Sequence, residues 1–117
     1  RGKTMKLRKL VEELGLEVVT GAGELDAEVT KGYVSDMLSD VMGNAEEGGL
    51  WITIQKHQNI VAVAVMKSLA AIVLVKGRKP DEDAAAKAER EGVVILSTEM
   101  SAFALAGKLH ALGVQGE

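Results

Sequence analysis

The sequence contains no cysteine, only two histidines, and no apolar run of the roughly 18 residues that span a membrane. Without cysteine, disulfides, thiol nucleophiles and cysteine metal sites are excluded. His57 and His110 are too few for a histidine-rich metal cage, so we expect no metal and no cofactor. A charged start followed by an apolar signal core is also lacking. We therefore expect a cytoplasmic protein that does not cross a membrane.

An excess of basic charge is lacking as well. Fourteen Lys and Arg stand against seventeen Asp and Glu, which gives a net charge of −3. Nucleic-acid binding needs a basic surface that displaces counterions from phosphates, so we expect no nucleic-acid partner. Hydrophobic residues make up 47% and charged residues 26% of the 117 positions, which is typical of a globular protein. The length predicts one domain over residues 5–117, with residues 1–4 as a terminal segment outside it.

Apolar, β-branched segments alternate with amphipathic ones along the chain. We predict strands near residues 16–19, 29–34, 50–54, 71–75 and 93–96. We predict helices over residues 5–14, 36–42, 59–68, 81–91 and 100–112. Ser35 and Asn59 are the expected caps of the second and third helices. Because strands and helices alternate in the second half, the expected fold class is α/β, in two or three layers, with a mostly parallel sheet of about five strands.

Residues 60–66 form an unbroken apolar run, whose periodicity fits a buried helix or a buried strand. The alanines within the run, the capping residue before it and the better strand after it favour a helix. A helix that is apolar on every side exceeds what one sheet face can bury, which predicts a homodimer. The interface expected from this reasoning lies on this helix and the preceding one, at Met37, Met42, Ile60, Val61 and Ala64.

Polar residues gather where the predicted strands end. Ligands of open α/β sheets bind at this edge, outside the carboxyl ends of the strands. Backbone amides at helix starts and a nearby lysine suit an anion, which predicts a phosphate or nucleotide ligand. The expected ligand-binding residues are Gln55, His57, Asn59, Lys76, Gly77, Ser97 and Thr98. The alternative, which the sequence leaves open, is that they are the caps and turn residues that every strand–helix junction needs.

Other patterns carry weaker signals. His57 could serve as the acid or base of a small enzyme, but no spacing pairs it with a hydroxyl and an orienting carboxylate. Asp36 and Asp40 lie four residues apart, a spacing that would suit a hard cation if a third carboxylate accompanied them. Gly21-Ala22-Gly23 begins like a dinucleotide-binding loop, but Asp26 stands where the third glycine belongs.

The chain resembles the DRTGG domain family between Gly32 and Gly113, in three segments at residues 32–45, 51–64 and 95–103. This family is similar to the N-terminal domain of HPr kinase/phosphorylase, and it occurs beside CBS domains in some pyrophosphatases and in phosphotransacetylases. The resemblance implies an α/β domain with an accessory or regulatory role, often at a dimer interface.

The family is named for an Asp-Arg pair and a Thr-Gly-Gly sequence, and the chain departs from both. It has Gln55-Lys56-His57 near the first position and Lys76-Gly77-Arg78 near the second, so one glycine is retained. The kinase activity of the HPr enzyme resides in a separate P-loop domain. Because this sequence contains no P-loop motif, the resemblance does not imply kinase activity.

These observations lead to three hypotheses of different classes. The leading one is a non-catalytic regulatory or scaffolding domain that acts through homodimerisation and binds a small anionic ligand. The alternative is a free-standing protein that binds a nucleotide or another small molecule, and the third is a small enzyme that uses His57. The residues do not identify the protein partner that a regulatory domain would serve.

Overall fold

The computed structural model describes residues 4–116, and a six-stranded sheet lies at its centre. Its middle consists of four parallel neighbours, β4 (Lys31–Val34), β5 (Leu50–Thr53), β6 (Ala71–Leu74) and β7 (Ile95–Ser97). At the edges, β8 (Gln115–Gly116) pairs parallel with β4, and β2 (Glu17–Thr20) pairs antiparallel with β7. The order β2-β7-β6-β5-β4-β8 confirms the expected α/β class with a mostly parallel sheet.

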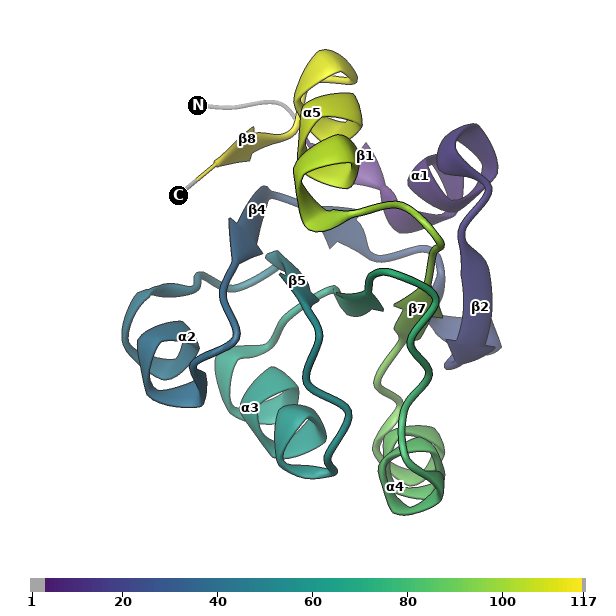
Figure 1. Cartoon of the computed structure of the whole chain (residues 1–117), viewed down its shortest axis with the longest axis vertical. Helices are drawn as coiled ribbons and strands as arrows, with labels where there is room; N and C mark the ends of the chain where they lie inside the picture. The colour runs from purple at the N-terminus through teal and green to yellow at the C-terminus, as the bar shows by residue number, and fades with distance from the viewer. Residues whose placement is uncertain (1–3, 117) are drawn as a thin grey trace.

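Helices cover both faces of the sheet (Figure 1). They are α1 (Leu7–Leu14), α2 (Leu38–Asn44), α3 (Asn59–Lys67), α4 (Glu82–Glu91) and α5 (Ala102–Ala111). Figure 1 shows α2, α3 and α4 on one face and α1 and α5 on the other, so the architecture has three layers. A 3-10 turn at Ala22–Glu24 and a small sheet of β1 (Met5–Lys6) and β3 (Glu28–Val29) complete the described part. Within residues 4–116, no helix has the length and apolar character needed to cross a membrane.

The side chains of the central strands alternate between two apolar cores. Leu50 and Ile52 pack into the core beneath α1 and α5, whereas Trp51, between them, packs into the core beneath α2, α3 and α4. Every residue of β5, β6 and β7 is buried. Parallel strands covered on both faces read as near-continuous apolar runs, which is why these three strands are the best predicted elements of the chain.

The N-terminal part departs from the predicted elements. The first helix begins at Leu7 rather than at residue 5, because Met5–Lys6 pairs with Glu28–Val29. The second predicted strand is divided at Thr30, whose amide donates to the Gly48 carbonyl at 2.9 Å instead of to a sheet neighbour. β8 was not predicted, since its two polar residues carry no strand signal in the sequence.

Both expected helix caps are wrong by one or two residues. The N-cap of α2 is Met37, and Ser35 Oγ accepts a hydrogen bond from the Met37 amide at 3.2 Å. The N-cap of α3 is Gln58, which makes Asn59 the first helical residue. The Asn59 amide donates to His57 Nδ1 at 3.2 Å, so a side-chain acceptor at the start of α3 comes from His57 rather than from Asn59.

The helical interpretation of residues 60–66 is confirmed, but the interface expected from it is wrong at three positions. Ile60, Val61 and Ala64 are 0%, 0% and 2% exposed, and they pack into the core of their own chain. In Figure 1, α3 lies against the sheet with α2 on one side and α4 on the other. The polar α4 covers more of α3 than its composition suggests, because its buried Ala88 faces the same core.

The Val61→Asp variant should therefore unfold the chain rather than separate subunits. An unpaired carboxylate at this fully buried position is expected to lower the free energy of unfolding by about 3–5 kcal/mol. Urea denaturation followed by the fluorescence of the buried Trp51 measures this loss. The control is Val34→Asp, at a position that is 52% exposed, where the carboxylate stays in water and a change within about 0.5 kcal/mol is expected.

Candidate functional site

The carboxyl ends of the four parallel strands lie at one edge of the sheet, and the loops that follow them form the candidate site. The loop after β6 contains two consecutive residues with positive φ, Lys76 at 59° and Gly77 at 72°. A non-glycine residue in this left-handed region is strained by about 1–2 kcal/mol, and such strain is often found at functional sites.

The backbone of this loop is docked on the segment between β7 and α5. The Lys76 amide donates to the Met100 carbonyl at 2.9 Å, and the Gly77 amide donates to the Thr98 carbonyl at 2.8 Å. The Arg78 amide donates back to the Val75 carbonyl at 3.2 Å. Since all three amides are used within the protein, the loop does not form the backbone cradle for an anion that the sequence suggested.

Ser97 and Thr98 likewise serve the structure of the loops. Ser97 is 3% exposed, and its hydroxyl donates to the Arg78 carbonyl at 2.7 Å. The Thr98 amide donates to the Leu74 carbonyl at 3.0 Å, and Thr98 Oγ1 accepts from the Met100 amide at 3.2 Å. The expected donation from the Thr98 amide to a ligand is therefore wrong, because that amide continues the sheet.

The loop after β5 is held by Asp36, which was not among the expected site residues. Asp36 Oδ1 accepts from Thr53 Oγ1 at 2.9 Å and from the Ile54 amide at 3.0 Å. Gln55 Nε2 donates to the Asp36 carbonyl at 2.8 Å, so the side chain of this expected ligand residue is engaged in the same contact. The sequence does show an aspartate between a strand and a helix, a position typical of side chains that bond to the backbone. Its partners belong to the neighbouring strand and the residue after it, so the local sequence could not identify them.

Asp40 has a different environment from Asp36. Its carboxylate accepts from Tyr33 Oη at 2.8 Å and from Asn44 Nδ2 at 2.9 Å. Hydrogen bonds, first from Ser35 and then from Tyr33, hold the pKa of Asp40 below its usual value. The two carboxylates thus stabilise separate local structures, and the described residues include no group of three or more side chains suited to a metal ion.

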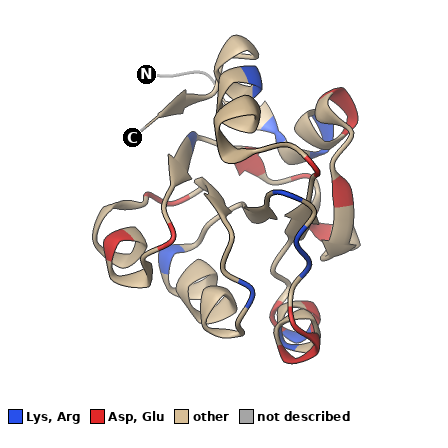
Figure 2. Cartoon of the chain, in the orientation of Figure 1, with Lys and Arg blue, Asp and Glu red and all other residues tan. Residues whose placement is uncertain are grey.

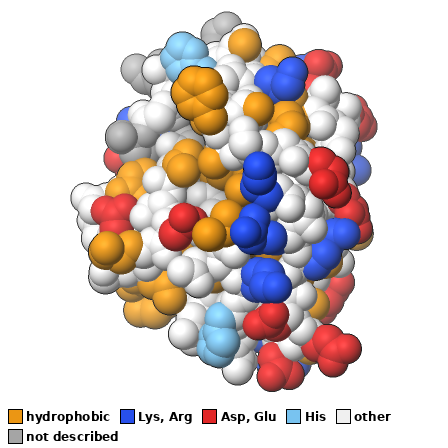
Figure 3. Space-filling view, in the orientation of Figure 1, with side chains coloured by type: hydrophobic (Ala, Val, Ile, Leu, Met, Phe, Trp, Pro, Cys, Tyr) orange, Lys and Arg blue, Asp and Glu red, His pale blue; other side chains and the backbone are white. Residues whose placement is uncertain are grey.

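Four basic residues lie in these loops: Lys56 after β5, and Lys76, Arg78 and Lys79 after β6. We call Lys56, Lys76 and Arg78 the basic cluster. The loops after β5 and β6 are joined, because the Asp81 amide donates to the Lys56 carbonyl at 3.0 Å. Figure 2 shows the basic positions on these loops, and Figure 3 shows a column of Lys and Arg side chains on this face. Within residues 4–116, ion pairs are found for the adjacent Lys79, which lies 3.2 Å from Glu17, but not for the basic cluster.

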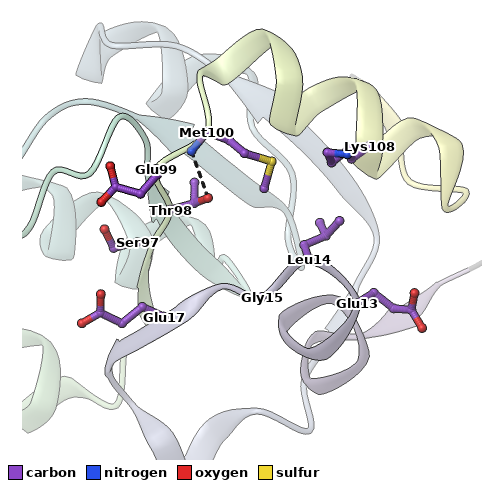
Figure 4. A pocket seen from close by; sticks show the side chains of 9 residues that line it. All are labelled: Glu13, Leu14, Gly15, Glu17, Ser97, Thr98, Glu99, Met100 and Lys108. Carbon is purple, nitrogen blue, oxygen red and sulfur yellow. Dashed lines mark hydrogen bonds between the residues drawn. The ribbon is translucent and has the colours of Figure 1, made fainter.

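A pocket of about 470 Å³ lies beside the basic cluster, between α1, the start of β2 and the segment before α5 (Figure 4). Ser97 and Thr98 line it together with Glu17, Glu99 and Lys108. Figure 4 shows the side chains of Glu17, Ser97 and Glu99 along one side of the pocket. Because three glutamates line this pocket, Ser97 and Thr98 face an acidic environment and do not fit the anion-binding site in which they were expected.

The structure therefore divides the expected site residues. Lys76 and Gly77 lie in one loop with Arg78, whereas Gln55 is bonded to Asp36 in the loop after β4, on the other side of β5 from β6. His57 and Asn59 lie at the exposed start of α3, in the loop that Lys56 joins to α4. Lys56 and Arg78 were not among the expected ligand-binding residues, but together with Lys76 they form the basic cluster.

The fold places this protein in the class of α/β domains that have a mostly parallel sheet and polar loops at one sheet edge. The chain belongs to the DRTGG domain family, whose model matches residues 9–112. Among solved structures, the chain is similar to the CBS and DRTGG domains of the regulatory region of Clostridium perfringens pyrophosphatase, crystallised with the activator diadenosine tetraphosphate. No curated protein matches the chain.

The likeness to the pyrophosphatase region is one of fold. The TM-score is 0.69 at 15% sequence identity, and the aligned part covers 87% of this chain. It covers 44% of the other chain, so this chain spans less than half of that regulatory region. The expectation of a DRTGG-like domain is thereby confirmed.

Gly77→Ala tests how firmly the loop after β6 is fixed. A β-carbon at Gly77 would meet Glu99 Oε1 at 2.8 Å, a contact that the flexible Glu99 side chain can relieve by moving. The positive φ cannot be relieved in this way, so we expect a loss of about 1–2 kcal/mol in the free energy of unfolding. In the control, Gly43→Ala within α2, a β-carbon meets nothing within 4 Å and should stabilise the helix by up to about 1 kcal/mol. Urea denaturation compares the two, and an equal effect of both substitutions would contradict the prediction.

Proposed function

We propose that this protein is a non-catalytic regulatory or scaffolding domain that forms a homodimer and binds a small anionic ligand at the basic cluster. The observation that carries the ligand is the basic cluster itself, three cations from two adjoining loops at the carboxyl edge of a parallel sheet. Because the backbone amides of the loop after β6 are engaged within the protein, side-chain charge does the binding. In the similar pyrophosphatase structure, the activator is itself a polyanion, which supports the class of ligand.

The outer surface of α3 supports the homodimer. α3 contains one charged residue, Lys67, at its last position. Val65 and Met66 are 45% and 69% exposed in its final turns, and Met42 is half-buried at the end of the adjacent α2. A helix that faces water ordinarily has a polar outer side, so this apolar stripe fits a second copy of the chain packed helix against helix about a two-fold axis.

The revised interface keeps the helices of the original expectation but changes its residues. Val65 and Met66 take the place of Ile60, Val61 and Ala64. Met42 stays in the interface at its edge. Met37, although 63% exposed, lies at the opposite end of α2 from Met42 and is not included.

His57 is better explained by structure than by catalysis. Its Nδ1 accepts the Asn59 amide at the start of α3, which is a capping role. An enzyme built on this ring would need a hydroxyl or carboxylate hydrogen-bonded to it, and no such contact occurs among the described residues. This supports the regulatory proposal over a small enzyme, while a free-standing ligand-binding protein remains the alternative of interest.

The basic cluster should bind inorganic tripolyphosphate. Isothermal titration calorimetry at low ionic strength is expected to show saturable binding that weakens as salt is raised, because the charges are exposed to solvent. Lys76→Ala combined with Arg78→Ala should reduce the affinity about tenfold, or about 1.4 kcal/mol. Arg90→Ala removes an exposed charge from the last turn of α4, at the far end of that helix from the site, and should leave the affinity unchanged. Equal losses in both variants would show non-specific charge attraction instead.

Light scattering after gel filtration should give twice the chain mass of 12.4 kDa at micromolar concentration. Met66→Glu places a charge in the proposed interface and should shift the mass to that of one chain. Phe103→Glu is the matched control, since Phe103 is 91% exposed on α5, on the other face of the sheet. A single-chain mass for the unaltered protein, or dissociation by the control alone, would argue against this interface.

A further inference from the structure

The most exposed large apolar side chain in the described part of the protein is an aromatic one. Phe103 is 91% exposed, whereas Trp51 is fully buried and Tyr33 donates its hydroxyl to Asp40. A single exposed apolar side chain is common on protein surfaces, and Phe103 becomes informative because other apolar side chains form a groove beside it. Phe103 lies in the first turn of α5, at the same edge of the sheet as the basic cluster.

An apolar groove of about 310 Å³ begins beside this ring and runs between α5 and β4. Phe103 and Val34 line it at the carboxyl edge of the sheet, and Ile52 and Leu109 line its depth. Gly107 keeps the α5 side open, because a β-carbon there would meet nothing within 4 Å. Its size lies at the lower end of the range for small-molecule sites. Among the described residues, His110 is the one ionisable side chain that lines it.

The groove and the basic cluster are connected in two ways. β5 places Ile52 in the groove, and the chain reaches Lys56 four residues later, a separation of at most about 14 Å. On the other side, the Lys76 amide is bonded to the Met100 carbonyl, three residues before Phe103. Figure 3 shows hydrophobic side chains beside the basic column on this face. The apolar groove, with Phe103 at its mouth, thus lies on the same side of the protein as the basic cluster.

This charge distribution matches one class of ligand. A nucleotide has an uncharged, planar base and a strongly anionic phosphate chain, joined by a sugar. Any of the nucleotide bases can stack on an exposed aromatic ring, since every base has a π-face. A purely apolar ligand would leave the cations unused, and inorganic phosphate would leave Phe103 and the groove unused.

We propose that the groove and the basic cluster form one nucleotide site, in which Phe103 stacks on the base and Lys56, Lys76 and Arg78 hold the phosphates. This inference rests on the proposed function, because it extends the anionic ligand of the basic cluster to a nucleotide. It assigns Phe103 the role of distinguishing a nucleotide from a bare polyphosphate.

The test compares ATP with inorganic tripolyphosphate, both without divalent cations, by isothermal titration calorimetry of the full chain. ATP is expected to bind at least tenfold more tightly, with shifts of the Gly107 amide resonance in NMR spectra that tripolyphosphate does not cause. Phe103→Leu keeps an apolar side chain but removes the ring, and should abolish the preference for ATP while leaving tripolyphosphate binding unchanged. Phe103→Tyr retains the ring and should retain the preference.

The possible failures are distinguishable. Tripolyphosphate binding with no preference for ATP would overturn the nucleotide site and leave the anionic ligand of the proposed function intact. If neither compound binds, the ligand part of the proposed function fails together with this inference. If Phe103→Leu separates a dimer and leaves ATP binding unchanged, the groove is a contact between copies of the chain and the nucleotide site is overturned.

Discussion

Burial of the central strands on both faces governs how the rest of this protein is arranged. Every residue of β5, β6 and β7 is covered, by α1 and α5 on one side and by α2, α3 and α4 on the other. Outside the groove between α5 and β4, the faces of these strands are therefore covered. Recognition is confined to the loops at the carboxyl edge, to the groove between α5 and β4, and to the outer sides of helices.

The loops at the carboxyl edge are tied to one another rather than left open. Asp36 fastens the loop before α2 to the end of β5, and the Lys56 carbonyl receives the amide of Asp81 before α4. The loop after β6 is fixed in the same way to the segment before α5, through Lys76 and Gly77. Hydrogen bonds within the protein thus consume the backbone groups that bind phosphate in glycine-rich loops, and side chains remain as the means of recognition.

The sequence predicted best what hydrophobic periodicity encodes. The buried runs at β5, β6 and β7 and the helical choice for residues 60–66 follow from side chains that must be covered locally, and all four are confirmed. Prediction failed where a residue's role depends on a distant partner. Thr30 leaves its strand for a bond to Gly48, and Ser97 turns its hydroxyl to the Arg78 carbonyl; neither contact has a local signal.

The same reason explains the error about the interface. Counting apolar residues around a helix indicates that α3 must be covered, but only the packing shows that α2 and α4 cover Ile60, Val61 and Ala64 and leave Val65 and Met66 outside. Phe103 is the converse case. In sequence it reads as an ordinary apolar residue near a helix start, and its 91% exposure appears only when α5 is placed over β4.

The departure from the family's Thr-Gly-Gly sequence acquires a physical meaning in this arrangement. Gly77 occupies the middle position, where a φ of 72° and the adjacent Glu99 carboxylate favour the absence of a side chain. The flanking positions are constrained through their backbones, by the bonds from Lys76 and Arg78 to Met100 and Val75, and their side chains are exposed. The loop can therefore keep its shape while the residues on either side of the glycine change. In this chain both flanking residues are cations, so the two positions that depart from the family pattern contribute positive charge to this edge of the sheet.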